Sequence, residues 1–158
     1  MGMTCSLHLV SPEELEKFKA GKLRANKLLV QAMNDEANLV YLDKAWQIIH
    51  FGLSGEEWDC NDAYGAAIMG GEALGSSETE KLLDQELVSE VAKVLEPIGE
   101  AEFKEMLLSR DLEDAELYCF DYDSIDEDVD YATSHYLTLR AAYLKAASMA
   151  CGVVVSIS

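Results

Sequence analysis

The two ends of the chain constrain its fold most, because each has a strand pattern while helical patterns fill the sequence between them. Residues 153–157, Val-Val-Val-Ser-Ile, are rich in β-branched side chains. Residues 3–10 alternate apolar with polar side chains, and the apolar set predicted to face the core is Met3, Cys5, Leu7 and Leu9. We therefore expect an α+β fold: a single helix-rich domain over residues 1–158, with a small sheet that includes the N-terminal and C-terminal strands.

The sequence Ser11-Pro12-Glu13-Glu14 predicts the start of the first helix. Serine is a good N-cap, proline suits the first helical position, and a glutamate three residues after the cap completes a capping box. This pattern predicts a helix that runs to about Ala20 and stops at Gly21. Residues 22–33 continue in a helical pattern, and we expect a loop over 34–41. The basic side chains of residues 17–27 are expected to complement the acidic half of the same molecule.

The second half of the chain contains further helical patterns. Amphipathic spacing predicts helices over 78–95 and 100–108, separated by Pro97 and Gly99. A helical turn is expected after Asp111, and a long helix over about 130–151. The glycine-rich stretch 54–75 is predicted to be irregular.

The stretch Leu42 to Gly55 is unusual, because it packs a tryptophan, a histidine and two glycines into a short apolar run. Asp43 is a plausible N-cap, and Gly52 is placed to end a helix. One face of that helix is apolar through Leu42, Ala45, Trp46 and Ile49, and the other is polar through Asp43, Gln47 and His50.

The polar face has two interpretations. It lines a pocket in which His50 acts as acid, base or hydrogen-bond donor, or else His50 caps helix carbonyls and Trp46 belongs to the core. On the first interpretation the glycine-rich stretch supplies further contacts, since irregular segments on rigid scaffolds often bind ligands. The candidate ligand-binding residues are then Asp43, Trp46, His50, Trp58 and Asp59.

The run LDKAWQIIHFGLSG at 42–55 resembles the signature of the YfbM-like family of small bacterial proteins, which are classed as a domain of unknown function. Three other segments resemble the same family: Met1-Gly2-Met3, QELVSEVAKVLEPI at 85–98 and YLTLRAAYLKAASMACGVVVSI at 136–157. The resemblance covers most of the chain and implies a single α+β domain. It supplies no activity, cofactor or catalytic residue to transfer.

Charge is the extreme property of this sequence, with 12 basic and 30 acidic side chains and a formal net charge of −18. Residues 72–130 hold 20 of the acids and 4 of the bases, which gives that segment −16. Such a field repels nucleic acid and anionic membrane surfaces, so we expect neither as a partner, and it could steer a basic protein.

Metal and cofactor sites are not expected. The four cysteines stand far apart with no zinc-binding spacing. The acidic stretch 121–130 fails as an EF-hand, because a loop starting at Asp126 has Tyr131 where glycine is required and Leu137 where a bidentate glutamate is required. We expect these acids to cap the final helix instead, where its dipole stabilises negative charge.

Location and activity are inferred from what the sequence lacks. No apolar run approaches the roughly 18–20 residues of a membrane span, and the chain does not open with a secretion signal, so a cytoplasmic protein is expected. No nucleophile–base set can be assembled with confident spacing; a Cys60–His50 pair is conceivable, but nothing requires it.

Two functions remain open. The favoured one is a non-enzymatic binding protein, with an inhibitor-like or immunity-like role toward a basic protein partner. The alternative is a small-molecule-binding protein or enzyme with a pocket around Trp46 and His50.

Overall fold

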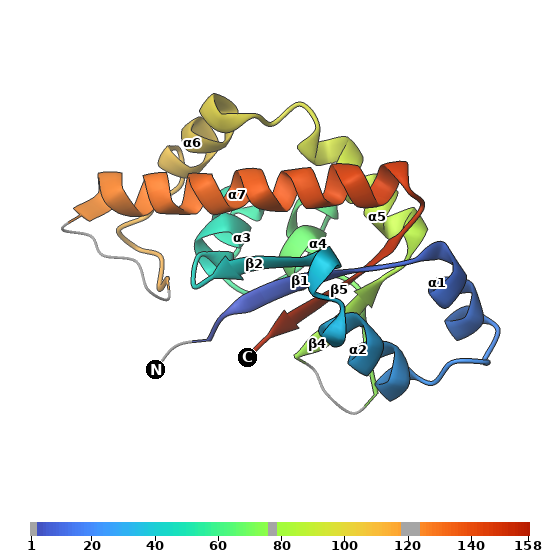
Figure 1. The fold of residues 1–158 in the computed structure, drawn as a ribbon. Helices are drawn as coiled ribbons and strands as arrows, with labels where there is room; N and C mark the ends of the chain where they lie inside the picture. The colour runs from blue at the N-terminus through green and yellow to red at the C-terminus, as the bar shows by residue number, and fades with distance from the viewer. Residues whose placement is uncertain (1–2, 76–78, 118–123) are drawn as a thin grey trace.

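The computed structural model describes residues 3–75, 79–117 and 124–158 and has one antiparallel sheet of five strands in the order β2-β1-β5-β4-β3 (Figure 1). The strands are β1 (Cys5–Val10), β2 (Leu39–Asp43), β3 (Glu72–Ala73), β4 (Glu80–Leu83) and β5 (Gly152–Ile157). The helices are α1 (Pro12–Lys19), α2 (Ala25–Asn34), α3 (Trp46–Ser54), α4 (Ala63–Met69), α5 (Gln85–Leu95), α6 (Glu100–Leu108) and α7 (Ile125–Ser148), with a short 3-10 turn η1 (Glu36–Asn38). The expected α+β single domain is confirmed.

The two terminal strands lie side by side at the centre of this sheet. They pair antiparallel from Cys5 opposite Ile157 to Val10 opposite Gly152. The expectation that both chain ends share one sheet is therefore confirmed.

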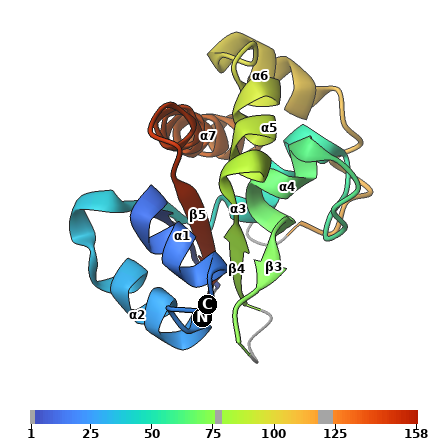
Figure 2. The same ribbon diagram turned by 90° about the vertical axis from the view of Figure 1, so that its right-hand side faces the viewer.

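Helices cover the sheet on both faces, as Figure 2 shows with the sheet nearly edge-on. Helices α1 and α2 enclose a small core with Val10, Leu82 and Val154, whereas the other helices enclose a larger core with Leu7 and Val155. Because both faces are covered, His8 is buried although it lies on the polar side of the β1 pattern. Met3 was expected to point inward, but its side chain is 40% exposed, since β1 begins only at Cys5.

Helix α1 follows its sequence signals closely. The backbone N–H of Glu14 donates to Ser11 Oγ at 3.2 Å, and Gly21 adopts a left-handed conformation with φ of 75° just after the helix. Helix α6 has the predicted bounds.

For the stretch Leu42 to Gly55, both predicted ends of the helix were wrong. Residues 39–43 form edge strand β2 instead of a loop and a helix cap, and Asp43 ends that strand with φ of 52°. Helix α3 continues through Gly52 and stops at Gly55, which has φ of 77°. Gly52 allows close packing of α3 against α6, because a Cβ there would lie 3.2 Å from the Phe103 ring.

Three further boundaries need correction. The stretch 54–75 contains helix α4, whose N-cap Asp62 accepts a hydrogen bond from the Gly65 N–H at 3.0 Å. The predicted helix 78–95 is strand β4 followed by α5, because Asp84 caps the helix through the Leu87 N–H at 2.9 Å. Helix α7 begins at Ile125 instead of at about residue 130, whereas a turn does follow Asp111, over residues 112–114.

The acidic stretch 121–130 falls partly outside the described residues, as does Cys119. Within the described part, the first turn of α7 contains Asp126, Glu127 and Asp128, which agrees with the expected interaction of these acids with the helix dipole.

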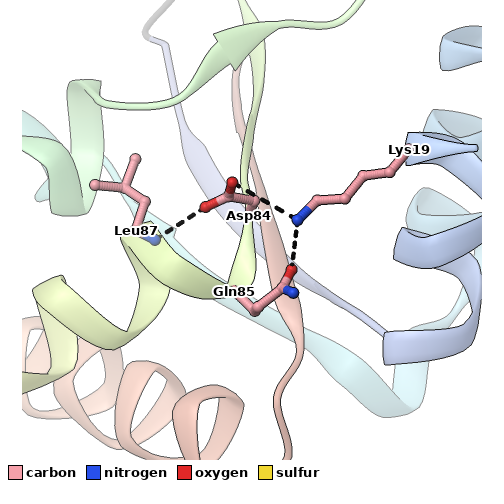
Figure 3. A network of polar contacts seen from close by, with 4 residues as sticks. All are labelled: Lys19, Asp84, Gln85 and Leu87. Atoms are coloured by element: carbon pink, nitrogen blue, oxygen red, sulfur yellow. Dashed lines mark hydrogen bonds and ion pairs between the residues drawn. The ribbon is translucent and has the colours of Figure 1, made fainter.

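The basic segment that includes α1 contacts the acidic half through Lys19 (Figure 3). Its Nζ donates to Gln85 Oε1 at 2.8 Å and lies 3.8 Å from Asp84 Oδ2, at the start of α5. Both charged side chains are more than two-fifths exposed, so the ion pair contributes at most about 1 kcal/mol.

Helix α7 is fixed to its neighbours by two buried tyrosines. Tyr143 Oη donates to the Ala67 carbonyl in α4 at 2.6 Å, and Tyr136 Oη donates to the Ile98 carbonyl at 2.7 Å. The Tyr136 ring also stacks on Phe103, with centroids 4.2 Å apart.

Among the described helices, none is long and apolar enough to cross a membrane.

The contact between α7 and α4 gives a stability prediction. Tyr143→Phe should lower the free energy of unfolding by about 1–3 kcal/mol, because a buried carbonyl oxygen loses its donor. Tyr41→Phe is the control, since the Tyr41 hydroxyl is exposed and makes only a 3.4 Å contact with Asp43. Urea unfolding of both variants measures the difference, and equal stabilities would contradict the prediction.

Candidate functional site

Helix α3 is buried from Trp46 to Leu53, and its apolar side is anchored by Trp46. The indole Nε1 of Trp46 donates to the Met3 carbonyl oxygen at 3.0 Å, which ties the start of the chain to this helix. Trp46 is therefore a core residue that also fixes Met3 in place.

The polar side of α3 holds the loop that follows it, residues 55–62, which we call the Trp58 loop. Gln47 Nε2 donates to the Glu57 carbonyl oxygen at 3.3 Å, and His50 Nε2 lies 2.9 Å from the Asp59 carbonyl oxygen. These two contacts fix the backbone on both sides of Trp58.

Trp58 is the large aromatic side chain that this loop presents to solvent. Its side chain is 54% exposed, and its ring centroid lies 5.7 Å from that of Trp46 at an interplanar angle of 57°. This tilted contact is a favourable geometry for two aromatic rings, so the exposed indole rests on a rigid support.

Trp58 lines an open hollow of about 720 Å³, which we call the acidic hollow. The described residues that line it are Met3, Gln47, Trp58, Glu113, Asp114, Ala115, Glu116 and Leu117. Three of them are acidic and none is basic. The hollow therefore combines an aromatic surface with uncompensated negative charge.

Residues 113–117, which we call the acidic wall of the hollow, are held against the Trp58 loop by a side chain of that loop. The N–H of Glu116 donates to Glu57 Oε1 at 2.9 Å. Just before this wall, the Arg110 guanidinium donates to the carbonyl oxygens of Gly52 and Leu53 at 3.1–3.3 Å, where it caps the C-terminus of α3.

Carboxylates lie close enough together at this wall to repel one another. The Asp111 carboxylate, through its hydrogen bond and its charge, raises the pKa of the exposed Asp114 carboxyl above its ordinary value. A bound cation would relieve this repulsion.

His50 lies beneath the hollow instead of lining it. Its ring is fully buried, Nδ1 has no hydrogen-bond partner, and the Ser54 hydroxyl donates to the His50 carbonyl at 2.7 Å. Burial lowers the pKa of the imidazole, although the Asp59 carbonyl and the Asp62 carboxylate oppose that shift. A neutral ring with Nε2 protonated is therefore the form that fits this site.

His50 and Cys60 do not bind one another. The Cys60 thiol contacts the Asp62 carbonyl oxygen at 3.8 Å, and burial together with the nearby Asp62 carboxylate raises the pKa of the thiol. A thiol with a raised pKa beside an imidazole with a lowered one is the reverse of an activated nucleophile.

Asp43 lies away from the acidic hollow. It accepts a hydrogen bond from the Tyr131 hydroxyl at 2.7 Å, which lowers the pKa of its carboxyl. It thus connects the end of β2 to α7.

The five candidate residues consequently have different places. Trp58 lines the hollow, Trp46 supports it, and Asp59 and His50 meet in the contact that holds its loop. Sequence reasoning did not find the contribution of residues 113–117, which come from a segment more than 50 positions after the loop. In the described part of the chain, no group of three or more His, Cys, Asp or Glu side chains is placed so that it could hold a metal ion.

Comparisons with known proteins identify relatives of this architecture. The model of a family described as Domain of unknown function (DUF1877) matches residues 1–156. The crystal structure of YfbM from Escherichia coli, a protein of unknown function, is similar with a TM-score of 0.68 at 16% identity, covering 98% of this chain and 99% of that one. No curated protein matches the sequence.

The contacts of Gln47 and His50 with the carbonyls of the Trp58 loop form what we call the clamp. It can be tested with Gln47→Met, which removes the donor to the Glu57 carbonyl but keeps the length of the side chain. We expect the free energy of unfolding to fall by about 1–2 kcal/mol. Trp58 fluorescence, taken as the difference from Trp58→Phe, should shift to the red as the indole becomes more mobile. Gln31→Met, at an exposed position of α2, is the control, and identical spectra for both variants would argue against the clamp.

Proposed function

Because the chain belongs to the DUF1877 family, which supplies no activity to transfer, we propose its function from the site itself: a non-enzymatic binding protein that holds a basic protein partner in the acidic hollow. The observation that carries this proposal is the half-exposed Trp58 ring in a hollow lined by three acids and no base.

Trp58 and the acids fit the same chemical group. A guanidinium or ammonium group over an indole face gains cation–π attraction, and a carboxylate nearby adds a charge-assisted hydrogen bond. Arginine suits this arrangement best, because its planar group stacks on an aromatic ring while its edge pairs with a carboxylate. Tryptophan in a well-supported position is also the residue type that most often dominates binding energy at protein interfaces.

The charge of the whole molecule supports the same partner. A net charge of −18 attracts a basic protein at long range and speeds encounter, and the hollow then provides the specific contact. An inhibitor-like or immunity-like protein works in this way, by covering a basic surface of its target.

Two further observations support a binding role in the cytoplasm. Cys5, Cys60 and Cys151 are free thiols, which suits a reducing compartment. The shifted pKa values of His50 and Cys60 disfavour nucleophilic catalysis by this pair.

The alternative is a small-molecule site. A volume of about 720 Å³ is within the range of ligand pockets, and an organic cation would meet the same indole and carboxylates. In this alternative the contacts come from Trp58 and Gln47, whereas Trp46 and His50 line none of the described cavities.

A charge-reversal experiment tests the proposal. Glu113→Lys with Glu116→Lys should weaken binding of a basic, arginine-containing peptide at least about tenfold, since two contacts worth about 1 kcal/mol each are replaced by repulsion. Trp58→Ala should have a similar effect. Dissociation constants from fluorescence anisotropy at low and physiological salt give the measurement.

The matched control is Glu86→Lys with Glu90→Lys, which changes the net charge equally on the exposed side of α5. It should weaken binding less than about threefold through the long-range field alone. Equal losses in the two double variants would mean that charge attracts the peptide without a defined site. Tight binding of a small organic cation without peptide binding would favour the alternative.

A further inference from the structure

We propose that His50 is a positioning residue for the acidic hollow and that only its neutral form keeps Trp58 in place, so that mild acid opens the Trp58 loop and weakens cation binding. The effect on binding rests on the proposed function, whereas the opening of the loop does not.

Helix α3 places the His50 side chain where it can hold the Trp58 loop. Gln47 and His50 are three residues apart and therefore lie on the same side of the helix. Their side chains hold the carbonyls of Glu57 and Asp59, one on each side of Trp58. Loss of the His50 contact frees the backbone on one side of the indole.

The tautomer follows from the hydrogen bond. Since a carbonyl oxygen can only accept, Nε2 of His50 must be the protonated nitrogen, and Nδ1 keeps its lone pair. This Nδ1 is buried without a hydrogen-bond partner. The adjoining face of α4 is packed closely, because a Cβ on Gly65 would lie 3.3 Å from Cε1 of the ring.

Protonation therefore creates a conflict. The imidazolium carries a second N–H at Nδ1, and in the closed loop Nδ1 is buried with no partner at hydrogen-bond geometry, so the nearby Gly65 backbone offsets only part of the cost of burying the charge. Opening of the loop would bring the charged ring into contact with water. Acid consequently shifts the balance from the closed to the open loop.

The groups around the ring determine the direction and the pH range. The Asp59 and Gly65 backbone and the Asp62 and Asp59 carboxylates favour the charged ring, but burial outweighs them and the pKa is lowered from the ordinary 6.5. A lowered pKa in the closed state means that closure is fully favoured above pH 6.5. It is progressively lost as the pH falls below 6.5 toward the pKa of the closed form.

Other titrating groups can be separated from His50. His8 is also buried with a lowered pKa, but it bonds to the Ser6 hydroxyl at 2.9 Å under α2, on the opposite face of the sheet. The Asp114 carboxyl at the hollow, whose pKa Asp111 raises, is present in both wild type and His50→Gln, so the comparison of these two proteins separates its titration from that of His50.

The test compares wild type with His50→Gln, whose neutral amide can still donate to the Asp59 carbonyl. The indole N–H resonance of Trp58, assigned by its loss in Trp58→Phe, is followed by ¹H–¹⁵N NMR from pH 7.5 to 5. We expect it to move in wild type with the same midpoint as the His50 ring protons. It should stay constant in His50→Gln and keep its response in His8→Gln.

The same pH series with the basic peptide tests the effect on binding. We expect affinity to fall at least about fivefold between pH 7 and 5 in wild type and less than about twofold in His50→Gln. If no peptide binds at any pH, the proposed function fails while the NMR titration still decides the loop opening.

A Trp58 resonance that stays fixed while His50 titrates would overturn the inference, as would an unchanged response in His50→Gln. If His50→Gln does not fold, as judged by circular dichroism at pH 7.5, wild type alone decides. The midpoint of the Trp58 shift must then coincide with that of His50 and differ from that of His8.

Discussion

The pairing of β1 with β5 is the interaction on which the rest of the fold depends. It joins the two ends of the sequence into the two central strands, so every other element is attached around them. A central strand is exposed on both faces unless helices cover both, and the small α1–α2 layer and the larger α3–α7 layer meet that need. The same arrangement places Met3, just before β1, next to Trp46 and at the edge of the acidic hollow.

Much of this architecture was predictable from the sequence, because alternation, β-branched runs and capping residues act locally. The terminal strands and helices α1 and α6 were found for that reason. Strand β2 was missed because Leu42, Ala45, Trp46 and Ile49 also fit a helical period, and only sheet pairing decides against a helix beginning at Asp43. Leu82 and Leu83 fit the helical pattern of α5 equally well, and the Asp84 cap sets the boundary.

The candidate site was less accessible to sequence reasoning. Trp58, a candidate taken from the glycine-rich stretch, lines the hollow, and its role in ligand binding stays a prediction. The clamp by Gln47 and His50 acts on carbonyl oxygens, which every residue possesses, so no sequence pattern reveals its targets. The acidic wall contacts the loop through the Glu57–Glu116 hydrogen bond, and Arg110 just before the wall binds the end of α3. Such long-range pairs appear only when the chain is folded.

The meeting of the two chain ends has a consequence for how this molecule can be rearranged. Thr4 and Ser158 exchange main-chain hydrogen bonds of 2.7 and 2.9 Å, which places these two residues side by side. A short peptide that joined residue 158 to residue 4 would close the backbone into a ring, from which circular permutants could be opened at any exposed turn, since each permutant retains the central strand pair.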